Sequence, residues 1–91
     1  MAMYTEIGDL IDDLLNANRR DVVRVKFPLT GNIFSRIEPV VYEIVKVGER
    51  RGLEISARQT SGVFNRTYLI QAKGAVIELM RFFNDIRWIW S

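Results

Sequence analysis

The sequence predicts an α+β fold, a two-layer sandwich in which helices cover one face of a three-stranded sheet. Three segments have apolar residues at helical spacing, three others alternate apolar and polar residues, and their order is helix, strand, helix, strand, strand, helix. The chain has 91 residues and is 48% hydrophobic, enough to bury one core, so we expect a single domain over residues 1–91. The expected helices span 4–20, 35–51 and 75–90, and the expected strands span 22–27, 53–58 and 64–73.

The order of the elements also predicts a topology. The first two strands should run parallel through a right-handed helical crossover, and the third should follow as an antiparallel hairpin partner. This is a split β-α-β, ferredoxin-like arrangement without its last strand and with an additional N-terminal helix. Because many functions share this topology, it predicts nothing about the activity.

The first helix is predicted from an amphipathic pattern. Its apolar stripe consists of Ile7, Leu10, Ile11, Leu14 and Leu15. Acidic residues occupy its N-terminal half, and Arg19 and Arg20 close the other end, as the helix dipole favours. Asn16 and Asn18 should weaken the last turn.

The strand at 22–27 is predicted from alternating β-branched and basic residues. The side chains expected to face the core are Val23, Val25 and Phe27. Arg24 and Lys26 should then face solvent, and Pro28 and Gly31 should end the strand.

The second helix is predicted from its ends as well as from its spacing. Ser35 and Glu38 have the spacing of a capping box, Pro39 falls in the first turn, and Gly52 suits the position after the last turn. The expected buried stripe is Ile37, Val40, Val41, Ile44 and Val47. Its many β-branched residues leave a strand as the alternative, but the caps and the spacing favour a helix.

The remaining strands should form a hairpin, because residues 59–62 between them have turn chemistry. The side chains expected to face inward are Leu53, Ile55, Ala57, Tyr68, Ile70 and Ala72, and those expected outward are Glu54, Ser56, Arg58, Thr67, Leu69, Gln71 and Lys73. The last helix should bury Val76, Leu79, Met80, Phe83 and Ile86.

The composition narrows the class of function. The chain has no histidine and no cysteine, and most catalytic and metal sites need one of them. Arginine, which recognises phosphate and carboxylate groups, is abundant. The net charge is +2, but residues 1–18 sum to −4 and residues 19–91 to +6. We therefore expect a non-enzymatic binding module without cofactor or metal.

The strongest candidate site is the outward face of the sheet, where basic, hydroxyl and amide side chains should gather. Such a face can follow a nucleic-acid backbone, and the hairpin tip can enter a groove. We assign phosphate contacts to Arg24, Lys26, Arg58, Arg66 and Lys73, polar contacts to Gln59, Thr60, Asn65 and Gln71, and base stacking to Phe64. The simpler interpretation is a solvated sheet face, and the sequence leaves open whether the acidic first helix covers it.

The aromatic C-terminus predicts an alternative function. One helical stripe cannot hold all its apolar side chains, so a second face should meet either the first helix or another protein. The candidate interface residues are Phe82, Trp88, Ile89 and Trp90. The alternative is therefore a homo-oligomer or a protein-interaction module with no nucleic-acid role.

Three further candidates are weaker. The segment 28–32 could offer backbone amides to an anion, but it lacks a P-loop motif. Asp9 and Asp13 share a helix face and could hold Mg²⁺ through water, although a solvated face is the simpler interpretation. The residues that could serve a histidine-free ribonuclease are Glu54, Arg66 and Tyr68.

The compartment follows from absent signals. The N-terminus has no basic and apolar regions of a signal peptide, and no apolar run reaches the roughly 18 residues of a membrane span. Because the lack of cysteine also fits a reducing environment, we expect a cytoplasmic protein.

Overall fold

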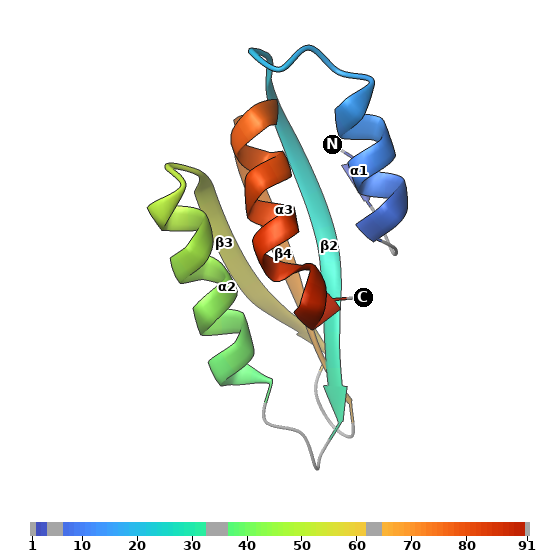
Figure 1. The fold of residues 1–91 in the computed structure, drawn as a ribbon. Helices are drawn as coiled ribbons and strands as arrows, with labels where there is room; N and C mark the ends of the chain where they lie inside the picture. The colour runs from blue at the N-terminus through green and yellow to red at the C-terminus, as the bar shows by residue number, and fades with distance from the viewer. Residues whose placement is uncertain (1, 4–6, 33–36, 62–64, 91) are drawn as a thin grey trace.

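Three helices form a layer against one face of a sheet (Figure 1). The structure, a computed structural model, describes residues 2–3, 7–32, 37–61 and 65–90, with side chains for 8–30, 37–60 and 67–87. The elements are β1 (Ala2–Met3), α1 (Ile7–Leu15), β2 (Val22–Asn32), α2 (Glu38–Arg50), β3 (Glu54–Ser61), β4 (Asn65–Ala75) and α3 (Val76–Trp90). In the helix layer, α3 lies between α1 and α2 and contacts both, while α2 also packs against β3.

The sheet has β4 at its centre, in the order β1-β2-β4-β3. Because β4 is antiparallel to both β2 and β3, these two strands run parallel to each other and α2 connects them. This confirms the predicted α+β class: three helices lie with a three-stranded sheet in which the hydrogen-bonded neighbours β2–β4 and β4–β3 are antiparallel. The two-residue β1 adds to the β2 edge in parallel, with Ala2 opposite Val25. Two residues carry no periodic signal, so the sequence did not predict this strand.

The core fills the space between the helices and the sheet. The ring of Phe83 is fully buried in it and meets Phe27 and Phe82 edge-on, with centroid distances of 5.3 and 5.0 Å. The buried strand residues are Val25, Phe27, Leu29, Leu53, Ile70 and Ala72, and the buried helix residues are Leu10, Leu14, Ile37, Val41, Ile44, Val76, Leu79, Phe82, Phe83 and Ile86. The alternation predicted for the strands is therefore confirmed for their fully buried positions.

The first helix is shorter than predicted, because α1 ends at Leu15 rather than at residue 20. The Asn16 side-chain amide donates to a backbone carbonyl one turn earlier at 3.1 Å, and the Asn18 side chain accepts from the Arg20 amide at 3.0 Å. Such local bonds compete with helical ones, so the predicted last turn, with its arginines, lies beyond the helix. Leu15 is 59% exposed and does not belong to the buried stripe. The predicted start at residues 4–6 lies outside the described residues.

The second helix begins differently from the predicted capping box. Glu38 is its first residue, and the N-cap position is Ile37, without a side-chain cap hydrogen bond. Ser35, the predicted cap, lies outside the described residues. Pro39 does fall in the first turn. Gly52 follows the helix with φ of +76°, a left-handed conformation that glycine adopts without a steric penalty.

The predicted end of the first strand is wrong, since β2 continues through Pro28 and Gly31 to Asn32. Pro28 lies opposite Leu69 of β4, on a strand whose other edge pairs with β1 only through Val25 and Lys26 among the described residues. A free strand edge tolerates the missing proline N–H. The segment 28–32 is thus a strand and not a loop with free backbone amides.

Candidate nucleic-acid interface

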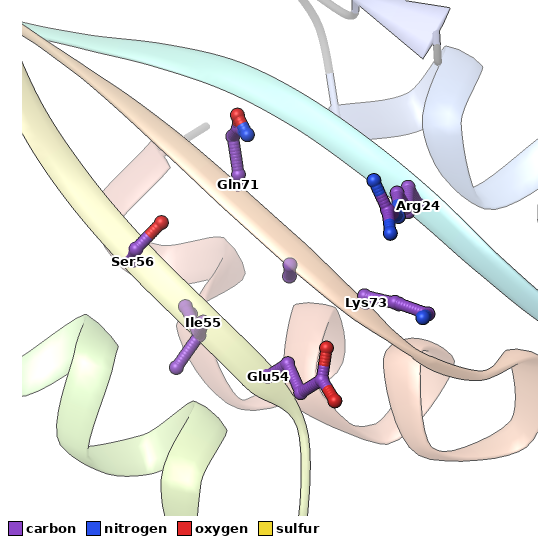
Figure 2. A pocket seen from close by; sticks show the side chains of 7 residues that line it. Arg24, Glu54, Ile55, Ser56, Gln71 and Lys73 are labelled. Atoms are coloured by element: carbon purple, nitrogen blue, oxygen red, sulfur yellow. The ribbon is translucent and has the colours of Figure 1, made fainter.

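The sheet has a second side that no described helix covers. Figure 2 looks onto this side: Arg24, Gln71 and Lys73 stand on the near side of their strands. Ile55 instead packs against Gly48 of α2, on the helix-bearing side. The acidic helix α1 packs against α3 in the helix layer and leaves this side free. We call this side the open face; its residues are Val22, Arg24, Lys26, Pro28, Thr30, Glu54, Ser56, Arg58, Thr67, Leu69, Gln71, Lys73 and Ala75.

The cross-strand register arranges the open face in rows, each running from β2 through β4 to β3. The rows are Arg24–Lys73–Glu54, Lys26–Gln71–Ser56, Pro28–Leu69–Arg58 and the pair Thr30–Thr67. Neighbouring strands are about 4.8 Å apart, and successive rows are about 6.7 Å apart along a strand. The predicted outward residues of the three strands therefore come together on one surface.

The first row, together with Gln71 and Ser56 of the second, borders a hollow of about 370 Å³ in the open face (Figure 2). It is lined by Arg24, Glu54, Ile55, Ser56, Gln71, Ala72 and Lys73. The side chains around it combine two cations, a carboxylate, an amide and a hydroxyl group. The hollow can therefore accept hydrogen bonds as well as donate them, which a purely cationic surface cannot do.

The open face has an excess of positive charge. It carries four described cations, at Arg24, Lys26, Arg58 and Lys73, against the one carboxylate of Glu54. Among the described residues, none of these five groups forms an ion pair. Arg24 and Lys73 are directly opposite each other, and like charges at such positions destabilise a sheet. An anion between them would relieve this repulsion.

Charges in the helix layer are arranged differently. The Arg51 guanidinium donates to Asp85 through both Nε, at 3.1 Å, and Nη2, at 2.8 Å, and links α2 to α3. Arg81 pairs with Glu78 one turn earlier in α3 at 2.9 Å. On α2, a hydrogen bond to the Tyr42 side chain raises the pKa of Lys46.

The far rows of the open face contain groups that the sequence analysis did not assign to the site. Pro28 and Leu69 lie opposite each other in the third row and form an apolar pair. In the fourth row, the Oγ1 atoms of Thr30 and Thr67 are 3.1 Å apart and share a hydrogen bond. Leu69 and Thr67 were predicted to face outward, but Pro28 and Thr30 were placed in a loop. The alternation that begins at Val22 was the sequence signal that could have placed Pro28 and Thr30 on the open face.

The hairpin tip follows the prediction only in part. Gln59 lies in the row of Tyr68 and Leu29, on the helix-bearing side, because the strand alternation continues as far as this position. It therefore does not join the open face. The Thr60 hydroxyl donates to the Thr67 carbonyl at 3.2 Å, beside a register shift at the end of β3. The side chains of Phe64, Asn65 and Arg66 lie outside the described residues.

The weaker candidates gain no support from the geometry. Glu54 and Tyr68 lie on opposite sides of the sheet, so the proposed ribonuclease group does not come together. Asp9 is exposed on α1, and the described residues contain no cluster of three or more possible metal ligands.

The aromatic C-terminus contributes to the core through Phe82, whose side chain is fully buried. A buried side chain cannot contact a partner, so Phe82 is a core residue and not part of an interface. The side chains of Trp88, Ile89 and Trp90 lie outside the described residues, and self-association through them stays a prediction.

Comparisons with known proteins identify no relative: no family model, no curated protein and no solved structure matches this chain. None of the helices in the described part of the chain has the length and apolar character needed to cross a membrane. The assignment of function therefore depends on the chemistry of the open face.

Proposed function

We propose that the protein is a non-enzymatic nucleic-acid-binding module and that the open face is its binding surface. The observation that carries this proposal is the pair Arg24 and Lys73, which lie opposite each other on an uncovered sheet face and form no ion pair among the described residues. The ferredoxin-like topology is part of the proposal, because β4 lies between the two strands that α2 connects.

The four cations of the open face are spread over three successive rows rather than gathered at one position. From the Arg24–Lys73 row, Lys26 lies one row further along β2, and Arg58 lies one row further again on β3. The step between rows is about 6.7 Å, so a chain of phosphates can cross the face with a cation near each step. Each neutralised phosphate releases counterions, which favours binding at low salt.

The polar groups have supporting roles in this proposal. Gln71, between Lys26 and Ser56, can donate and accept hydrogen bonds at a base edge or a sugar. Leu69 and Pro28 offer an apolar surface to a base or a sugar ring. No aromatic side chain stands on the open face among the described residues, so we expect weak sequence preference.

Fluorescence anisotropy with labelled 20-nucleotide RNA and DNA strands, measured from 50 to 300 mM salt, tests the proposal. With four cations in contact, the slope of log affinity against log salt should be about −2 to −3. The Arg24→Glu/Lys73→Glu variant should lose binding. Lys46→Glu/Arg50→Glu, which makes the same charge change on α2, should retain most of it.

Thermal unfolding establishes that both variants are folded. The proposal is wrong if the wild-type protein does not bind, if its binding is independent of salt, or if the two charge-reversed variants lose affinity equally.

A further inference from the structure

Glu54 is out of place on a surface that binds only phosphates. It is the one carboxylate among the described groups of the open face, and it lies directly opposite Lys73 in the most cationic row. A carboxylate here repels a nucleic-acid backbone and weakens binding unless it contacts the ligand favourably. The favourable contact open to an ionised carboxylate is to accept a hydrogen bond.

The backbone at Glu54 is held firmly on both sides. Leu53 is buried and packs against Gly74, where an added Cβ would clash with the Leu53 side chain. On the other side, Ile55 packs against Gly48 of α2, where an added Cβ would lie 2.7 Å from the Ile55 Cδ1 atom. The Glu54 side chain therefore leaves the sheet from a fixed position, beside the hollow.

The row Arg24–Lys73–Glu54 presents hydrogen-bond donors and an acceptor to the same ligand. Arg24 and Lys73 offer donors for a phosphate, and Glu54 offers an acceptor from the next strand, whose backbone lies about 4.8 Å from that of β4. In Figure 2 these three side chains border the same end of the hollow. Among the described residues, the Glu54 carboxylate has no ion pair or side-chain hydrogen bond of its own. The complementary ligand has an anionic group with a hydroxyl donor close to it.

We propose that the hollow binds a ribose phosphate unit of an RNA strand, with the phosphate between Arg24 and Lys73 and the neighbouring 2′-hydroxyl donating to Glu54. This inference rests on the proposed function and names its substrate class. The 2′-hydroxyl is the group by which a protein distinguishes RNA from DNA at a given site. Glu54 is then a specificity-determining residue, and the cations supply affinity for either nucleic acid.

The test compares a 12-nucleotide RNA strand, the DNA strand of the same sequence, and AMP as a free ribonucleotide. The wild-type protein should bind the RNA roughly three- to tenfold more tightly than the DNA, the range expected for one hydrogen bond at a solvent-accessible site. AMP, which carries one phosphate, should bind far more weakly than either strand; binding of AMP as tight as that of the RNA would identify a nucleotide site and overturn the assignment to a strand.

Two alanine variants separate recognition from electrostatics. Glu54→Ala should remove the preference for RNA, with the RNA affinity falling toward that for DNA. Glu43→Ala removes the same charge from the exposed side of α2 and should keep the preference. Unfolding midpoints establish that both variants are folded.

The outcomes distinguish this inference from the proposed function. Equal affinity of the wild-type protein for RNA and DNA overturns the ribose assignment and leaves nucleic-acid binding standing. A Glu54→Ala variant that binds both strands more tightly, with an unchanged ratio, shows that the carboxylate only repels phosphate and overturns the assignment too. Absence of binding to either strand overturns both proposals.

Discussion

Neighbouring residues of β2 have opposite surroundings. Val25 and Phe27 are 3% and 0% exposed beneath the helices, whereas Arg24 stands exposed on the other side of the same strand. The same contrast holds along β4, where Ile70 is buried and Gln71 borders the hollow. One face of the sheet thus makes the core, and the other carries no packing role that would constrain its polar residues. The exposed polar side chains of this face are therefore available for recognition, and most of them can be changed without unfolding the protein.

The largest expected effect is on the helix-bearing face. Phe83→Ala removes a ring that is fully buried between Phe27 and Phe82, and it should lower the free energy of unfolding by about 3–5 kcal/mol. Leu69→Ala, on the open face, leaves no enclosed cavity and should lower it by less than about 1 kcal/mol. Urea unfolding followed by circular dichroism measures both values. Similar losses in the two variants would contradict the difference between the faces.

The next effect concerns the contact between Gly74 and Leu53. Gly74→Ala places a Cβ atom against the Leu53 side chain, and the resulting overpacking should cost about 1–3 kcal/mol. Gly8→Ala is the matched control, because Gly8 lies in α1 with no atom within 4 Å of the added Cβ. A glycine in a helix is unfavourable, so this variant should gain about 0.5–1 kcal/mol. Opposite signs are expected in the same unfolding experiment, and a neutral Gly74→Ala would show that the contact between Leu53 and Gly74 is loose.

The smallest expected effect on the free energy of unfolding comes from surface charges, both those that form an ion pair and those that do not. Arg51 and Asp85 link α2 to α3, but their side chains are 35% and 38% exposed, so solvent screens the interaction. A double-mutant cycle with Arg51→Met and Asp85→Asn should give a coupling free energy of about 0.5 kcal/mol at low salt, decreasing as salt is added. By contrast, Arg24→Met should leave stability unchanged or raise it slightly, because it removes repulsion from Lys73. A marked loss of stability in Arg24→Met would show that this arginine has a structural role.

The sequence predicted the fold well where periodicity is strong. The alternation in β2 and β4 placed Val25, Phe27 and Ile70 in the core and Arg24 on the open face, and helix α3 starts within a residue of its prediction. The end of β2 was less predictable, because it depends on pairing with residues of β4 that are distant in sequence. Pro28 reads as a strand breaker until its edge position is known.

The candidate site shows the same limit. The sequence predicted the outward cations of the three strands, but not the rows that place Arg24 beside Lys73 and Lys73 beside Glu54. Those neighbours depend on the register of β4 between β2 and β3, and the alternation within one strand sets which side faces the core but not which residues lie opposite one another. The position of the acidic first helix was also open from the sequence, since an amphipathic helix can cover either side of a sheet.

The most direct test of the account is to titrate the isotopically labelled protein with a single-stranded RNA 12-mer and to map the amide chemical-shift changes by nuclear magnetic resonance. The account predicts the largest changes on the open face, at Arg24, Lys26, Gln71 and Lys73, with small changes on the exposed side of α2 at Glu43 and Lys46. Changes concentrated on α2 or α3, with an unaffected open face, would contradict it.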